Sequence, residues 1–175
     1  FVPVLAARPL AFSRLALPAL LCSCFGTVTL AGGFLSLDGY EIARPFFLLG
    51  PVALGLSFAM LAVMILSTLI TRQTLRLPEV RMVIVALAGL AGLWLSGAAM
   101  VSTLTGSHLA VDISQALPLH MLFGIGGFLT FAACGVSYKL FAMFLLAPEA
   151  ASWQRRAVFS LAALMAGLML TGLVM

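Results

Sequence analysis

The sequence predicts an all-α integral membrane protein, and three observations support that fold class. Hydrophobic residues make up 63% of the 175 residues and charged residues only 8%, whereas a soluble domain has roughly 25% charged residues. Five apolar runs each approach or exceed the ~20 residues that a helix needs to cross a bilayer. Lysine and arginine collect in alternate connections between these runs. We therefore expect one transmembrane helical domain over residues 1–175 with five transmembrane helices.

The first two predicted helices cover about residues 15–37 and 45–71. Pro45 suits the first turn of a helix, where its missing N–H has no intrahelical partner. Pro51 lies further inside the second run and predicts a kink there. The connection that follows contains Pro78, which predicts a break in the helix before the third run.

The third predicted helix covers residues 82–104 and has small residues on one face. Ala88, Gly92 and Ser96 are spaced four residues apart, a pattern that lets transmembrane helices approach closely. We expect this ladder to pack against the fourth helix. Trp94 lies in the middle of the span rather than at an interface, and both core packing and contact with a cofactor account for that position.

The fourth predicted helix covers residues 117–147 and has a polar group near each end, His120 and Lys139. These residues lie ~28 Å apart along a helix, close to the ~30 Å thickness of the hydrocarbon layer. Small residues between them offer close contact with a neighbour: Gly124, Gly126, Gly127 and Gly135. A polar connection with Trp153, Arg155 and Arg156 at the membrane surface leads to the fifth helix, residues 157–175.

Charge predicts the orientation of the helices. Eight of the nine lysine and arginine residues fall in or beside the segments on one side of the predicted membrane, and Arg44 is the exception. By the positive-inside rule, the amino terminus is cytoplasmic and the carboxyl-terminal end is outside. These cytoplasmic positions account for the net charge of +4, so we expect no nucleic-acid partner.

The chain begins at Phe1 without an initiator methionine and stops at Met175 inside an apolar run. We expect it to be a piece of a longer helical bundle. The three cysteines (Cys22, Cys24 and Cys134) all lie in apolar runs, which favours packing over disulfides.

One stretch of the fourth helix resembles a known family. His120, Gly127-Phe128, Gly135-Val136-Ser137-Tyr138-Lys139-Leu140 and Met143-Phe144 are similar to a segment of bacterial membrane proteins related to heme-copper oxidase subunit I. The similarity covers about 25 of the 175 residues. The matching family helix starts with a His-x-His pair that ligates two hemes. Here the first position is His120 and the second is Leu122, so the resemblance implies at most one heme ligand.

The resemblance suggests a cofactor site and a location in the bacterial inner (cytoplasmic) membrane. His120 is the candidate metal or heme ligand, with Gly124, Gly127 and Trp94 beside a flat macrocycle. The alternative is that His120 is a polar cap at the membrane surface. Lys139 either extends its amine to the surface or contacts an anionic lipid or heme propionate.

Two functions remain open from the sequence. The first is a structural or accessory subunit that packs, with lipid, against other transmembrane subunits or missing helices of the same chain. The second is a heme- or copper-binding protein in electron transfer or gas handling. No self-contained catalytic site is recognisable, so whether the protein is an enzyme is left open; the cofactor is also left open, with heme as the candidate.

Overall fold

The computed structural model describes residues 2–3, 8–37, 40–71, 74–106 and 111–144, together with residues 153, 156–157, 160–161, 163–165, 167–168 and 171. All regular elements within these residues are helical. Four helical stretches are long and apolar enough to cross a membrane: Ser13–Leu35, Ala43–Leu69, Pro78–Leu104 and Ile113–Phe141. The all-helical class is therefore confirmed, and four helices have the length and composition that a membrane crossing requires. The predicted fifth helix, 157–175, lies largely outside the described residues.

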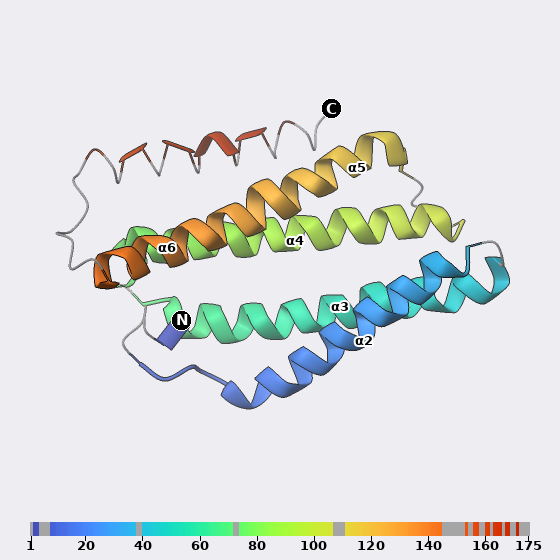
Figure 1. Ribbon diagram of the computed structural model, residues 1–175, viewed down its shortest axis with the longest axis horizontal. Coiled ribbons are helices and arrows are strands. Elements are labelled where there is room, and N and C mark those ends of the chain that lie inside the picture. Colours follow the sequence, from blue (N-terminus) through green and yellow to red (C-terminus); the bar gives the residue numbers. More distant parts are fainter. Residues whose placement is uncertain are drawn as a thin grey trace.

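The long helices form two antiparallel hairpins that lie side by side (Figure 1). The first hairpin pairs α2 (Ala16–Leu35) with α3 (Tyr40–Leu69). The second pairs α4 (Pro78–Leu104) with a continuous helical stretch made of α5 (Ile113–Met121), the π-helix η3 (Leu122–Leu129) and α6 (Thr130–Phe144). Short 3₁₀ turns, η1 (Ser13–Leu15) and η2 (Thr74–Arg76), precede α2 and α4.

Three helices, α3, α4 and α5, begin four or five residues earlier than predicted. Pro78 is the first residue of α4 rather than part of the connection, because the first helical position needs no N–H partner. α5 begins at Ile113, since the side chain of Asp112 caps it by accepting a hydrogen bond of 2.9 Å from the Ser114 N–H. In α3, Pro45 and Pro51 both lie inside a helix that already starts at Tyr40.

The first hairpin is held by two glycine contacts that mirror each other. Leu54 of α3 lies over Gly26 of α2, and Leu30 of α2 lies over Gly50 of α3. A methyl group added to Gly26 would come 2.8 Å from the Leu54 Cγ, and one added to Gly50 would come 2.6 Å from the Leu30 Cγ. Each glycine thus accepts an aliphatic side chain from the facing helix, the close approach that small residues allow in membranes.

The second hairpin is packed through glycines of α4. At Gly89, an added Cβ would lie 2.6 Å from the carbonyl carbon of Gly127, so the two backbones are in direct contact. Gly92 faces the Phe123 ring, to which an added Cβ would come within 2.4 Å. The predicted ladder placed Ala88 on this face, but Ala88 is exposed and Gly89 takes the position. Residues 89, 92 and 96 share a face because steps of three and four alternate on a 3.6-residue helix.

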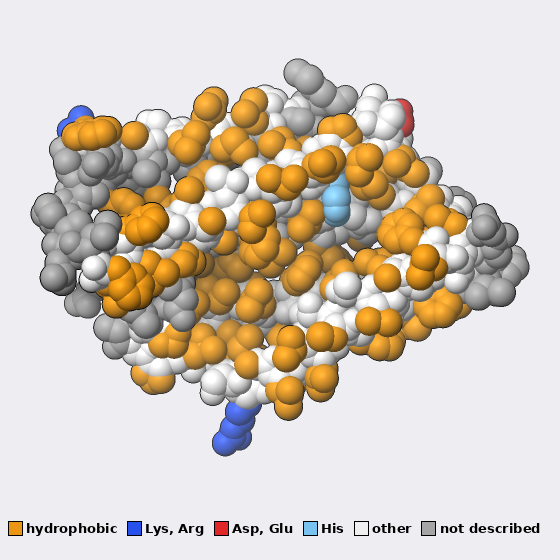
Figure 2. All heavy atoms as spheres, in the orientation of Figure 1, with side chains coloured by type: hydrophobic (Ala, Val, Ile, Leu, Met, Phe, Trp, Pro, Cys, Tyr) orange, Lys and Arg blue, Asp and Glu red, His pale blue; other side chains and the backbone are white. Residues whose placement is uncertain are grey.

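The outer surface is mainly apolar. Large side chains stand more than half exposed on α2 and α3, among them Val28, Leu35 and Val52. Figure 2 shows hydrophobic side chains over both hairpins, with few charged groups among them. Soluble proteins rarely expose contiguous apolar patches of more than a few hundred Å², so this surface fits contact with lipid tails or other transmembrane helices.

Candidate functional site

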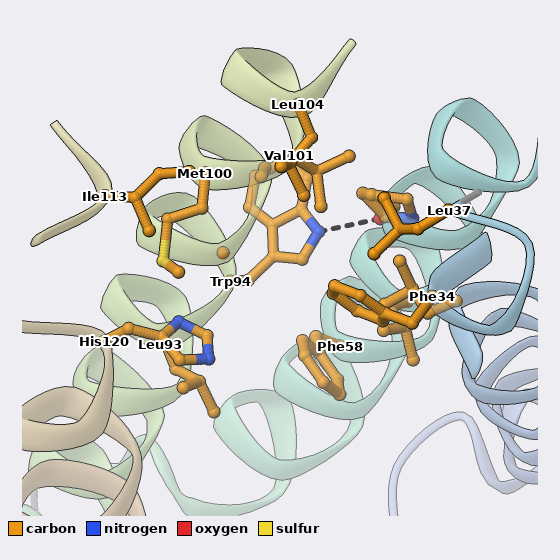
Figure 3. Close-up of a pocket in the computed structure, with 15 residues that line it drawn as sticks. Phe34, Leu37, Phe58, Leu93, Trp94, Met100, Val101, Leu104, Ile113 and His120 are labelled. Carbon is orange, nitrogen blue, oxygen red and sulfur yellow. Dashed lines mark hydrogen bonds between the residues drawn. The ribbon is translucent and has the colours of Figure 1, made fainter. Parts of the chain in front are cut away.

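A cavity of about 460 Å³ lies between the two hairpins. Helices α2 and α3 form one side, and α4 and α5 form the other (Figure 3). Its lining is almost wholly apolar: Leu30, Phe34, Leu37, Pro51, Leu54, Phe58, Leu93, Trp94, Gly97, Ala98, Met100, Val101, Leu104, Ile113 and His120. Its volume is within the range of about 300–1,000 Å³ found for small-molecule sites.

Trp94 joins the two hairpins at this cavity. Its indole N–H donates a hydrogen bond of 2.8 Å to the Pro51 carbonyl on α3, the contact drawn as a dashed line in Figure 3. Gly55 leaves room for the ring, because an added Cβ there would lie 2.7 Å from the indole. The indole is therefore fixed in orientation and has already used its one donor.

Two phenylalanines face Trp94 and His120 across the cavity. Phe34 comes from α2 and Phe58 from α3 (Figure 3). Phe34 also packs edge-on against Phe47, with ring centroids 5.1 Å apart and an interplanar angle of 79°. Such T-shaped pairs are a favoured aromatic geometry. The cavity therefore has aromatic faces on both sides.

His120 contributes the ionisable group among the described lining residues. Its Nδ1 lies 3.1 Å from the Ser96 Oγ. The ring also rests against Gly97, where an added Cβ would come 2.9 Å from Cε1. Figure 3 shows the imidazole extending from α5 toward the interior of the cavity. Two adjacent small residues of α4, Ser96 and Gly97, thus orient the histidine ring.

The hydrogen bonds of Ser96 indicate which nitrogen of His120 carries the proton. The Ser96 hydroxyl lies 2.8 Å from the Gly92 carbonyl and 3.1 Å from the Leu93 carbonyl. We assign its single proton to this backbone pair, as serines inside helices commonly arrange it. With this assignment the oxygen accepts from the Nδ1–H of His120. In a neutral imidazole this leaves Nε2 as a bare acceptor, and Nε2 has no hydrogen-bond partner among the described residues.

A π-helical segment follows His120 directly. Over Leu122–Leu129 the chain takes the wider π turn, and both the N–H and the hydroxyl of Thr130 reach back to the Ile125 carbonyl. Segments of this kind occur often at functional sites. Within this segment Gly127 faces α4, where it packs against Gly89.

The structure brings together only part of the predicted cofactor set. His120 and Trp94 line the cavity. Gly124 instead packs on the side chain of Leu93, and Gly127 packs on Gly89, so neither glycine borders the space available to a ligand. Sequence reasoning missed Gly97, Phe34 and Phe58, which come from three different helices.

The remaining predicted residues lie elsewhere. Gly135 packs near the backbone oxygen of Glu79 at the far end of α4, 3.2 Å from an added Cβ. Lys139 is half-buried on α6. Trp153 and Arg156 are exposed, and Arg155 lies outside the described residues. The second histidine of the sequence, His108, is also outside them.

Metal ligands do not gather at the cavity. Within the described part of the chain, no group of three His, Cys, Asp or Glu side chains is close enough to hold a metal ion. A copper site of the usual ligand number therefore has no basis in these residues. Among the described lining residues, the imidazole of His120 is the one candidate metal ligand of these four types.

Comparison of the chain with protein-family models, with curated proteins and with solved structures finds no match. The class of protein consequently rests on the fold and the site. It is a helical membrane-spanning protein whose two described hairpins enclose an apolar cavity with one oriented histidine. The similarity to heme-copper oxidase subunit I stays a prediction from 25 residues.

Proposed function

We propose that the protein is an accessory transmembrane subunit of a larger membrane complex. One observation carries this proposal: α4 presents small side chains on its exposed face. Ala88 and Ala91, about one turn apart, are both exposed and form a short stripe of small residues. In membranes, small residues mark the surfaces where another helix approaches closely. A lipid-facing helix needs no such residues.

The test is a bulky substitution on that stripe. Ala91→Leu is expected to reduce the amount of complex recovered with the tagged protein from mild detergent, because the added side chain separates the helices. Val52→Leu is the matched control, since Val52 is 58% exposed on α3 among other large residues. Equal recovery of the complex with both variants contradicts the proposal, provided that both unfold at the temperature of the parent protein.

Orientation and location belong to the same proposal. The distribution of lysine and arginine supports an inner bacterial membrane with the amino terminus inside. In a cysteine-free background, an impermeant thiol reagent added from outside is expected to label Ser107→Cys and to spare Gln73→Cys. Both positions lie outside the described residues. The reverse labelling pattern would overturn this orientation.

A second candidate is a heme-binding protein, favoured by the bare Nε2 of His120. When bound, heme would supply electron-transfer or gas-binding chemistry at its iron. The fit is incomplete, because the described lining includes no lysine or arginine for the two heme carboxylates. A Soret band in the purified protein that disappears in His120→Ala would establish this candidate. A wild type without a Soret band, purified with heme supplied, excludes it.

A further inference from the structure

We propose that the cavity between the hairpins binds an apolar aromatic molecule with a hydroxyl group, such as an alkylphenol, whose O–H donates to the Nε2 of His120. This inference goes beyond the accessory-subunit function and does not depend on it. It rests on the hydrogen bonds made by the lining residues, on the aromatic walls and on the apolar lining around the histidine.

The hydrogen-bonding groups of the cavity lining define the polar half of the ligand. Ser96 occupies the Nδ1 side of His120 at 3.1 Å. The Trp94 N–H is bonded to the Pro51 carbonyl at 2.8 Å. Among the described lining residues, the side chains therefore offer one unoccupied acceptor, Nε2, and no unoccupied N–H or O–H donor. A ligand with a hydroxyl donor complements this pattern, whereas a ligand with only a carbonyl or ether oxygen does not.

The apolar lining around His120 increases the value of that hydrogen bond. The described lining is almost wholly apolar, and an unmade hydrogen bond in an apolar setting costs free energy. A ligand hydroxyl supplies the missing donor. The surrounding lining is apolar, so the rest of the ligand must be apolar too.

The walls define the shape of the apolar half. Phe58 and Phe34 face the imidazole and Trp94 from the other hairpin (Figure 3). Aromatic rings pack well in edge-to-face and offset arrangements, which a phenol ring between these residues can make. The lining also contains aliphatic side chains, such as Leu30 and Leu104, that suit an alkyl chain.

Access to the site is from the side. Figure 2 shows the molecule hollowed between the two hairpins. Because His120 lines the cavity and is itself only half-buried, the site reaches the surface that we expect lipid to cover. A lipid-soluble alkylphenol in the bilayer can enter there without crossing the polar ends of the helices.

The protein contains its own probe for this binding. It has two tryptophans, and Trp94 lines the cavity, so Trp153→Phe leaves Trp94 as the only emitter. The probes are 4-(6-bromohexyl)phenol and its methyl ether, in which a methyl group replaces the hydroxyl proton and removes the hydrogen-bond donor. Bromine quenches tryptophan fluorescence, and the purified full-length chain in detergent is titrated with each compound.

We expect the phenol to bind about fivefold more tightly than the ether, in line with one net hydrogen bond. His120→Leu should remove this preference and leave binding of the ether unchanged. His120→Gln should restore part of the preference, because its amide oxygen can accept. Ser96→Ala should reduce it, since Nδ1–H then loses the partner that fixes the tautomer.

Several outcomes overturn the inference. Equal affinity of phenol and ether in the parent protein excludes the proposed hydrogen bond. A preference that persists in both His120 variants places the hydroxyl elsewhere. Quenching by neither compound excludes the cavity as a binding site, and a Soret band in the parent protein assigns Nε2 to heme iron. Each of these results leaves the Ala91→Leu test of the accessory-subunit function unaffected.

Discussion

The two hairpins use glycine in the same way but place different groups against it. In the first hairpin, Gly26 and Gly50 each accept a leucine side chain from the facing helix. In the second, Gly89 meets the Gly127 backbone, Gly92 meets the Phe123 ring and Gly97 meets the His120 ring. Backbone atoms also come close in the first hairpin, where an added Cβ at Gly26 would lie 3.0 Å from the Gly50 carbonyl oxygen, but the backbone approach at Gly89 is tighter, at 2.6 Å.

This difference indicates a division of roles. In the contacts between α2 and α3, the atoms nearest to Gly26 and Gly50 belong to leucine side chains, and the backbone of the facing helix lies 3.0 Å or more from an added Cβ. The contacts of α4 with Gly127, Phe123 and His120 fix the position of a histidine ring beside the cavity. The second hairpin is therefore the part of the molecule in which geometry matters for binding, and the first provides the opposite wall.

The largest expected effect comes from Gly92→Leu. An added Cβ at Gly92 already lies 2.4 Å from the Phe123 ring, so a leucine must force the helices of the second hairpin apart. We expect a loss of about 3 kcal/mol or more in unfolding free energy, the upper range for overpacking. Unfolding followed by circular dichroism in mixed detergent measures it. A stability equal to that of the parent protein would refute the contact.

A smaller effect on stability is expected from replacing single glycines with alanine. Gly89→Ala is expected to destabilise the protein by about 2 kcal/mol, because the backbone carbonyl carbon of Gly127, 2.6 Å away, cannot rotate aside. Gly32→Ala in α2 is the control. Its added Cβ lies 3.5 Å from the Phe46 ring, an ordinary contact. There the better helix propensity of alanine should stabilise by up to ~1 kcal/mol. Equal effects at the two sites would contradict the distinction between the hairpins.

Trp94→Phe tests the junction between the hairpins. It removes the N–H that donates to the Pro51 carbonyl while it keeps an aromatic ring. Interhelical hydrogen bonds in membranes contribute about 0.6 kcal/mol on average, so we expect a loss of that order in the same unfolding experiment. Ser57→Ala is a useful comparison, since the Ser57 hydroxyl donates to the Ala19 carbonyl inside the first hairpin. A loss several times larger for Trp94→Phe alone would mean that indole packing dominates.

The smallest effect concerns the start of the second hairpin's return helix. Hydrogen bonds from the Ser114 hydroxyl and then the Ser114 N–H hold the pKa of Asp112 below its ordinary value. A carboxyl whose pKa is lowered by folding stabilises the helix start above its unfolded pKa. That stabilisation is lost as pH falls through the folded pKa.

Amide hydrogen exchange at residues 114–116 reports this loss. Protection, corrected for the intrinsic effect of pH, should fall in acid in the parent protein. In Asp112→Asn it should be independent of pH over the same range. An identical pH response in both proteins would assign the effect to another group.

Several features of the site could be predicted from residues alone. His120 and Trp94 stand out in the sequence because a polar ring and a large aromatic within apolar spans are uncommon, and both line the cavity. The hydrogen-bond partner of His120 was not predicted from the sequence. Ser96 was predicted as a packing residue, and only the alignment of α4 with α5 brings its hydroxyl to the imidazole.

The sequence by itself determined the membrane-spanning helical class and the approximate positions of the four described spans, because backbone groups in lipid must be satisfied within a helix and apolar length sets the crossing. Tertiary structure decided which face each helix presents. Which residues meet across α4 and its partner helix, such as Gly89 with Gly127 and Ser96 with His120, was settled by the packing of the helices. The cavity likewise exists only where four helices from two hairpins meet, since its walls come from residues up to 90 positions apart, Leu30 and His120.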